Sequence, residues 1–230
     1  TTRPVDDPNF YRVRQGMISI YPALKKRFAG VAGYFTLGPT FQTTNIENTP
    51  GRYISIYGTG ENEHIFEHKY FAGAQLGFHY NNVDNFFQPH SGIRFNLILN
   101  WVDNFNVDEN FTSIRSQLSF YKHLDPKENI VIASQIGYGQ NFGKGYEFFQ
   151  MPNIGGSLGL RGYRTERFYG DISFWQSTDL RVRFSNSENR ILPFTWGVFG
   201  SFDYGRVWLK GEASESWHNS VGGGIWLSPV

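Results

Sequence analysis

Three residues near position 65 have the spacing of a zinc-binding motif. The stretch His64-Ile65-Phe66-Glu67-His68 matches the H-x-x-E-H pattern of a family of zinc hydrolases. That pattern requires a helix, because only a helix presents both histidines on one face. The surrounding stretch, 58–69, is polar and is predicted to be a loop between strands, so we expect no catalytic zinc here.

A single arginine stands in a glycine-rich segment. Residues 151–164 read Met-Pro-Asn-Ile-Gly-Gly-Ser-Leu-Gly-Leu-Arg-Gly-Tyr-Arg, which places Arg161 between Leu160 and Gly162. Clustered glycines allow a loop to fold back tightly. Taken alone, the segment also fits a flexible surface loop with one solvated arginine.

Other patterns that carry chemistry are missing from the sequence. There is no cysteine, which excludes disulfides, thiol catalysis and thiolate metal sites. There is no Gly-x-Ser-x-Gly, and no predicted helix follows Gly137-Tyr138-Gly139, so a nucleotide loop is not expected. We therefore predict no enzyme activity, cofactor or metal within this segment.

The elements that must position Arg161 are strands, because apolar and polar residues alternate with a period of two. In the segment 170–185, Leu180 and Val182 alternate with Asp179, Arg181 and Arg183. Turn signals such as Asn48-Thr49-Pro50-Gly51 separate the runs. About ten strands are predicted in one domain spanning 1–230, near 10–22, 27–42, 52–58, 68–81, 91–102, 111–123, 129–142, 170–185, 193–209 and 217–228.

The composition favours a membrane barrel over the alternative, a soluble β-sandwich. Aromatic residues make up 18% of the chain although hydrophobic residues make up only 40%. The polar face of each strand is rich in Gly, Ser, Gln and Arg, as in a wet barrel interior. No apolar run approaches the roughly 20 residues of a membrane-spanning helix. The apolar face should point into lipid at Leu97, Leu99, Leu118, Phe120, Ile132, Ile136, Leu180 and Val182.

Two ordered motifs carry a resemblance to a known family. The segment around Arg161 resembles the signature loop of the bacterial surface antigen barrels of the Omp85 superfamily, through Gly155, Gly156, Leu160, Arg161, Gly162, Tyr163 and Gly170. A second family pattern is similar to Phe202-Asp203-Tyr204-Gly205-Arg206-Val207-Trp208. A third, the turn 84–92, lacks the proline that the family has after Asn85. The resemblance covers about 68–228.

The resemblance implies that the loop folds into the barrel lumen and that Arg161 binds an acidic residue of the inner wall. Asp203 shares its small, polar face with Gly205, and Asp179 lies on the charged face of the preceding strand. Four further arginines are expected to face the lumen, where they either pair with these and other acids or make the lumen basic. They are Arg94, Arg115, Arg181 and Arg183.

The resemblance also implies the cellular role. A barrel of this family lies in the bacterial outer membrane, contacts its lipids and lipopolysaccharide, and assembles or translocates protein or lipid, with polypeptide substrates as partners. The alternative is a membrane anchor and export platform for an N-terminal hydrolase domain, patatin-like or metallophosphatase. A plain diffusion porin is disfavoured by a loop that fills the lumen.

Two expectations concern the whole protein. Family members have five strands after the signature loop and three are predicted here, so a complete all-β antiparallel transmembrane β-barrel should have twelve strands, of which this chain lacks the last two. A soluble domain is expected upstream. The formal net charge of +1 provides no electrostatic basis for binding nucleic acid.

Overall fold

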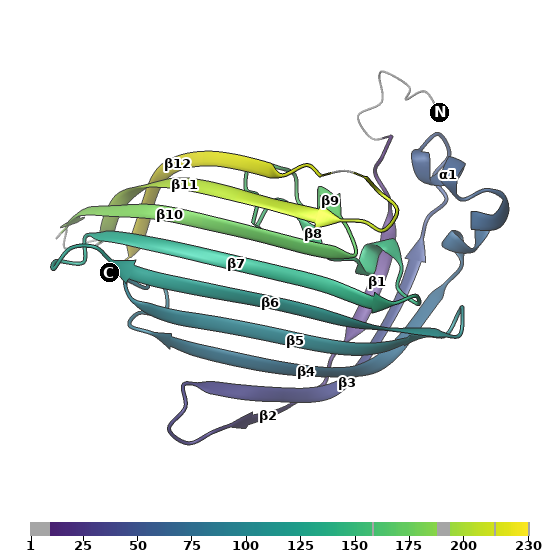
Figure 1. Cartoon of the computed structure of the whole chain (residues 1–230), viewed down its shortest axis with the longest axis horizontal. Coiled ribbons are helices and arrows are strands. Elements are labelled where there is room, and N and C mark those ends of the chain that lie inside the picture. Colours follow the sequence, from purple (N-terminus) through teal and green to yellow (C-terminus); the bar gives the residue numbers. More distant parts are fainter. Residues whose placement is uncertain (1–9, 158, 188–193, 214, 230) are drawn as a thin grey trace.

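The computed structural model describes residues 10–157, 159–187, 194–213 and 215–229. It is a ten-stranded antiparallel sheet that forms one curved wall, together with a two-stranded sheet (Figure 1). The predicted all-β, antiparallel barrel sheet is confirmed. Among the described residues, no helix is long and apolar enough to cross a membrane.

Neighbouring strands of the wall follow the chain order, β1-β3-β4-β5-β6-β7-β10-β11-β12, and β2 also pairs with β3. The strands of the wall are β1 (Gln15–Ile20), β2 (Leu24–Arg27), β3 (Gly33–Ile46), β4 (Lys69–Val83), β5 (Gly92–Asn104), β6 (Glu109–His123), β7 (Ile130–Gly143), β10 (Ile172–Ser187), β11 (Phe194–Trp208) and β12 (His218–Pro229). The two-stranded sheet joins β8 (Asn153–Ile154) to β9 (Phe168–Tyr169).

The strands β1 and β2 both pair antiparallel with β3, β1 with its residues 41–46 and β2 with its residues 34–37. They therefore lie end to end along one edge of β3. Pro22 stands between them, and proline cannot donate a hydrogen bond to a strand ladder. The chain bends onto Gly38 of β3, where an added Cβ would lie 1.9 Å from the Pro22 carbonyl oxygen. Glycine is therefore needed opposite the break.

The predicted strand at 52–58 is wrong, because this stretch forms α1 (Tyr53–Tyr57), followed by the 3-10 helix η1 (Gly60–Phe66). The sequence Tyr-Ile-Ser-Ile-Tyr alternates as a strand does. However, it lies outside the wall, where Ile54 packs with Ile46 and Ile65 in a small buried cluster. Burial of one side of a single turn outweighed the local strand propensity.

The outer surface of the wall is apolar, as predicted. Leu118, Phe120, Ile136 and Leu180 are exposed, and the other predicted lipid-facing residues are half-buried. A polar group on this surface, Ser134, Gln176 and Thr178, is satisfied by mutual hydrogen bonds of 2.9–3.3 Å.

The inner face is covered by the connection between β7 and β10, residues 144–171, which we call the lumen loop. Its segment β8 contacts the strands β10 and β11. Two buried apolar clusters lie between the loop and the wall: Ile154, Leu160 and Trp175 in one, and Phe71, Val102 and Phe111 in the other. The core of this molecule is therefore the contact between one loop and the wall.

Candidate functional site: an arginine anchored in the lumen

The lumen loop reverses direction at glycines that adopt left-handed backbone angles. Gly155, Gly156 and Gly159 have φ values of 129°, 64° and 82°. The reversal is closed by the Gly156 amide, which donates to the carbonyl oxygens of Leu160 (3.0 Å) and Tyr163 (3.2 Å). Residues with a side chain are disfavoured at such angles. The clustered glycines therefore shape the tip of the loop.

Close packing holds this tip against the wall. Leu160 is completely buried beside Trp175 of β10. A Cβ at Gly159 would lie 2.3 Å from the Trp175 ring, and a Cβ at Gly205 would lie 3.0 Å from the Trp175 Cβ. Gly205 makes room for the tryptophan, because the two residues are cross-strand partners.

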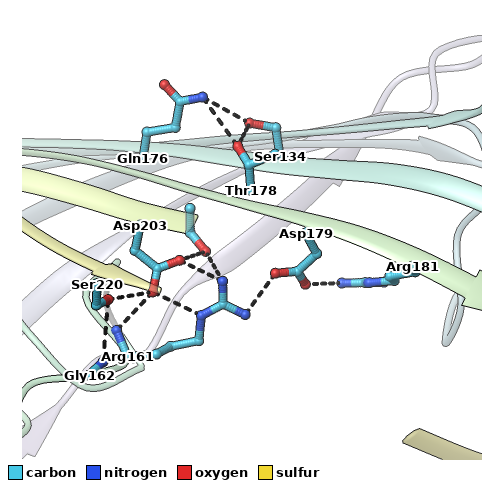
Figure 2. Close-up of polar contacts among 10 residues, drawn as sticks. Ser134, Arg161, Gly162, Gln176, Thr178, Asp179, Arg181, Asp203 and Ser220 are labelled. Carbon is cyan, nitrogen blue, oxygen red and sulfur yellow. Dashed lines mark hydrogen bonds and ion pairs between the residues drawn. The ribbon is translucent and has the colours of Figure 1, made fainter. Parts of the chain in front are cut away.

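Arg161 reaches two strands of the inner wall at once (Figure 2). Its Nε donates to Asp203 Oδ2 at 3.0 Å and its Nη2 to Asp203 Oδ1 at 2.5 Å. Its Nη1 forms an ion pair of 2.8 Å with Asp179 Oδ1. Ser177 and Ser220 donate to the Asp203 carboxylate as well, at 2.8 and 3.1 Å. We call these five residues the arginine anchor.

The arginine anchor compensates the burial of Asp203. Only 2% of the Asp203 side chain is exposed, and a buried charge is tolerated when it is paired and fully hydrogen-bonded. The backbone amide of Arg161 adds one more hydrogen bond, of 3.0 Å. The two parallel bonds from one guanidinium to one carboxylate fix the direction of the arginine as well as its distance.

The remaining motif residues lie near the start of β12. A Cβ at Gly162 would lie 2.9 Å from the Ser220 Cβ, which shows how closely the loop approaches the wall. The Tyr163 ring packs edge-on against the rings of Phe168 (5.3 Å) and His218 (5.9 Å). The structure thus brings Arg161 to both predicted acids, and it places Gly155, Gly156, Leu160, Gly162, Tyr163 and Gly205 in the surrounding packing.

The four other predicted lumen arginines make different contacts. Among them only Arg181 forms an ion pair with an acid in the described part of the chain, at 3.0 Å from Asp179. Arg94 and Arg183 donate to turn carbonyls, and Arg115 donates to the Gln150 carbonyl oxygen at 2.9 Å. Of the two alternatives, pairing with acids therefore holds in the described residues for Arg181 and not for Arg94, Arg115 and Arg183, whose guanidinium groups donate to carbonyl oxygens instead.

A second attachment of the lumen loop was not predicted from the sequence. Lys69 Nζ lies 2.8 Å from Glu147 Oε1, and only 1% of the lysine side chain and 16% of the glutamate side chain are exposed. Asn104 donates to the Gly145 carbonyl oxygen nearby, at 2.9 Å. We call Lys69 and Glu147 the lysine anchor.

Tyr146 lies beside the lysine anchor, and its hydroxyl donates to Asp171 Oδ1. Burial, together with the hydrogen bond and the charge of Asp171, raises the pKa of Tyr146 to about 12. The hydroxyl therefore remains a donor over the whole physiological pH range.

The zinc-like pattern does not lie on one helix, as that pattern requires. Only His64 lies in η1, and Glu67 and His68 follow its end, so part of the predicted loop is helical. In the described part of the chain, His64, Glu67 and His68 do not form a metal-binding group.

Comparisons with known proteins agree with this geometry. The model of the Omp85 superfamily domain matches residues 7–229. The chain belongs to the Omp85 superfamily. The predicted resemblance is confirmed, and it extends over nearly the whole chain.

A solved structure has the same fold. BamA from Haemophilus ducreyi, crystallised without POTRA domains 1–3, superposes with a TM-score of 0.71 at 15% sequence identity. The match covers 95% of this chain and 51% of that one, so the chain spans about half the length of the BamA structure. A search of curated proteins found no match.

Proposed function

We propose that this Omp85 barrel lies in the bacterial outer membrane and inserts or translocates polypeptides there, with the lumen loop as its internal plug. The observation that carries the proposal is the arginine anchor. It ties the lumen loop to the inner wall through Arg161, Asp203 and Asp179, within the range that the Omp85 superfamily model matches.

The lengths of the connections support an orientation. The two longest connections, 47–68 and 144–171, lie at one end of the wall together with the short connection 105–108, and the connections 28–32, 84–91 and 124–129 lie at the other. Outer-membrane barrels have short periplasmic turns and longer extracellular loops. We therefore assign the end opposite the two longest connections to the periplasm, and the outward apolar face to the lipid.

The experiment is depletion of the full-length protein in its native bacterium, followed by measurement of the folded, heat-modifiable fraction of other outer-membrane proteins. We expect that fraction to fall, and we expect an Arg161→Ala copy to restore it incompletely. Arg164→Ala is the matched control, since Arg164 belongs to the same loop and is exposed.

Two outcomes would decide between the candidate roles. Unchanged folding of other outer-membrane proteins after depletion would contradict the assembly role. If a hydrolase activity were then lost from the cell surface, the anchor role would be supported instead. The upstream sequence offers an independent check, because polypeptide-transport repeats favour assembly and a hydrolase domain favours anchoring.

A further inference from the structure

Two turns at the periplasmic end lie side by side. Residues 84–91 join β4 to β5, and residues 124–129 join β6 to β7. The strands β5 and β6 between them are paired, with Gly92 opposite Tyr121. His90 lies two residues before Gly92 and His123 two residues after Tyr121, so both histidines stand beside the end of this ladder.

Two carboxylates complete a group with these histidines. Asp84 Oδ2 lies 3.3 Å from His90 Nδ1. Glu128 lies between the two imidazoles, with Oε2 at 3.9 Å from His90 Nδ1 and Oε1 at 3.9 Å from His123 Nδ1. One oxygen or nitrogen of each of Asp84, His90 and Glu128 lies within 4.8 Å of the others. Two ligands of a tetrahedral zinc are ~3.4 Å apart, so small side-chain rotations would close these three residues around an ion, and His123, which lies 3.9 Å from Glu128, would turn toward it as the fourth ligand.

The surroundings leave ligand atoms available. Asp84 Oδ1 accepts hydrogen bonds of 3.0 Å from the backbone amides of His90 and Ser91, which orient the carboxylate and direct Oδ2 toward the imidazole. Burial raises the pKa of the Asp84 carboxyl, but the hydrogen bonds from Ser91, His90 and Asn85 and the charge of His90 outweigh it and lower the pKa. Among the described residues, His123 Nδ1 has no hydrogen-bond partner although the atom itself is covered and 41% of the side chain is exposed, and covered polar atoms are normally paired.

We propose that Asp84, His90, His123 and Glu128 bind one divalent transition-metal ion of the zinc type. Two imidazole nitrogens and two carboxylate oxygens suit zinc, whereas calcium and magnesium prefer oxygen ligands alone. Four protein ligands leave no open position, so the ion is structural rather than catalytic. It clamps the two periplasmic turns together.

The clamp lies at the rim of a cavity of about 290 Å³. His90 and Glu128 line that cavity together with Arg161, Asp179 and Arg181. The metal site therefore shapes the periplasmic mouth of the space that leads to the arginine anchor.

The experiment uses the full-length protein in detergent, stripped of metal, with Co²⁺ and Zn²⁺ as probes. We expect Co²⁺ to give the visible absorption of a tetrahedral complex with mixed nitrogen and oxygen ligands, and Zn²⁺ to displace it. His90→Gln and Glu128→Gln should each weaken Zn²⁺ binding by at least ~10-fold, since even outer-shell changes cost about 10- to 100-fold.

The control is the double variant His64→Gln, His68→Gln, which removes the other closely spaced histidines and should leave Zn²⁺ affinity unchanged. Loss of Zn²⁺ binding in that control would overturn the proposal, as would unchanged affinity in His90→Gln. If the variants fail to fold, the Co²⁺ spectrum of the unaltered protein still decides, because an octahedral spectrum contradicts the site.

Discussion

The lumen loop is attached to the wall by two ionic anchors, the lysine anchor and the arginine anchor, which differ in their exposure to water. The lysine anchor is dry, with exposed side-chain fractions of 1% for Lys69 and 16% for Glu147. In the arginine anchor, 38% of the Arg161 side chain is exposed although its partner Asp203 is buried. Removal of the cation should therefore be costly at the dry anchor, and milder at the arginine anchor, where other hydrogen-bond donors still satisfy the buried Asp203.

The largest effect is expected from Lys69→Ala. It leaves the Glu147 carboxylate nearly buried without a cation, which should lower the free energy of unfolding by about 3–5 kcal/mol. Urea unfolding of the refolded barrel in detergent measures this. Lys122→Ala is the control, because Lys122 is exposed on β6. Equal losses in both variants would mean that the lysine anchor contributes nothing.

Gly159→Ala should be next, at about 2–4 kcal/mol, because it adds a clash with Trp175 to the strain of a left-handed residue. Gly211→Ala separates the two contributions. Gly211 has a similar φ of 85°, but an added Cβ there has no neighbour within 4 Å. Its variant should lose only about 1–2 kcal/mol in the same unfolding measurement. Equal losses would show that packing against Trp175 is unimportant.

Arg161→Ala should cost about 2 kcal/mol, less than the dry anchor, because Ser177, Ser220 and the backbone amide of residue 161 still donate to Asp203. Hydrogen exchange should rise for amides 155–163 but not for the strands. Arg161→Lys keeps the positive charge but loses the two parallel hydrogen bonds to Asp203. Its free energy of unfolding should therefore lie between those of the unaltered protein and Arg161→Ala. If hydrogen exchange of amides 155–163 were unchanged in Arg161→Ala, Arg161 would not be what holds the loop against the wall.

The smallest effect belongs to Tyr146→Phe, which removes one hydrogen bond to a carboxylate and should cost about 1 kcal/mol at neutral pH. The pKa of Tyr146 is raised in the folded protein. Its contribution is therefore present below the unfolded pKa of about 10 and is lost as the pH rises toward about 12. The stability difference between the variant and the unaltered protein should shrink across that interval, and a constant difference would contradict the assignment.

The sequence was sufficient for the features that depend on local pattern. Alternation predicted the wall and its two faces, and parity placed Asp179 and Asp203 on the inner face. The glycines around Arg161 indicated a loop that folds back. These features are encoded within one strand or one loop, so no knowledge of distant contacts was required.

Features that depend on distant contacts could not be predicted. Lys69 and Glu147 are far apart in the sequence, and neither belongs to a motif. Ser177 shares a face with Asp179, but only the register of β10 with β11 places it opposite Asp203. The helix α1 (Tyr53–Tyr57) has the same alternation of residues as a strand. A local sequence pattern does not show that its Ile54 is buried against Ile46 and Ile65.

The arginine anchor has a consequence for how the barrel folds. Arg161 contacts β10 and β11 together, and Asp179 and Asp203 come within its reach on the same face only in the native pairing of these strands, in which Asp203 stands opposite Ser177. A slip of β11 by one residue would turn Asp203 to the outside and leave the arginine without its main partner. Docking of the loop through Arg161 is therefore possible only on correctly paired strands, so the arginine anchor stabilises the native register of β10 and β11 over a shifted one.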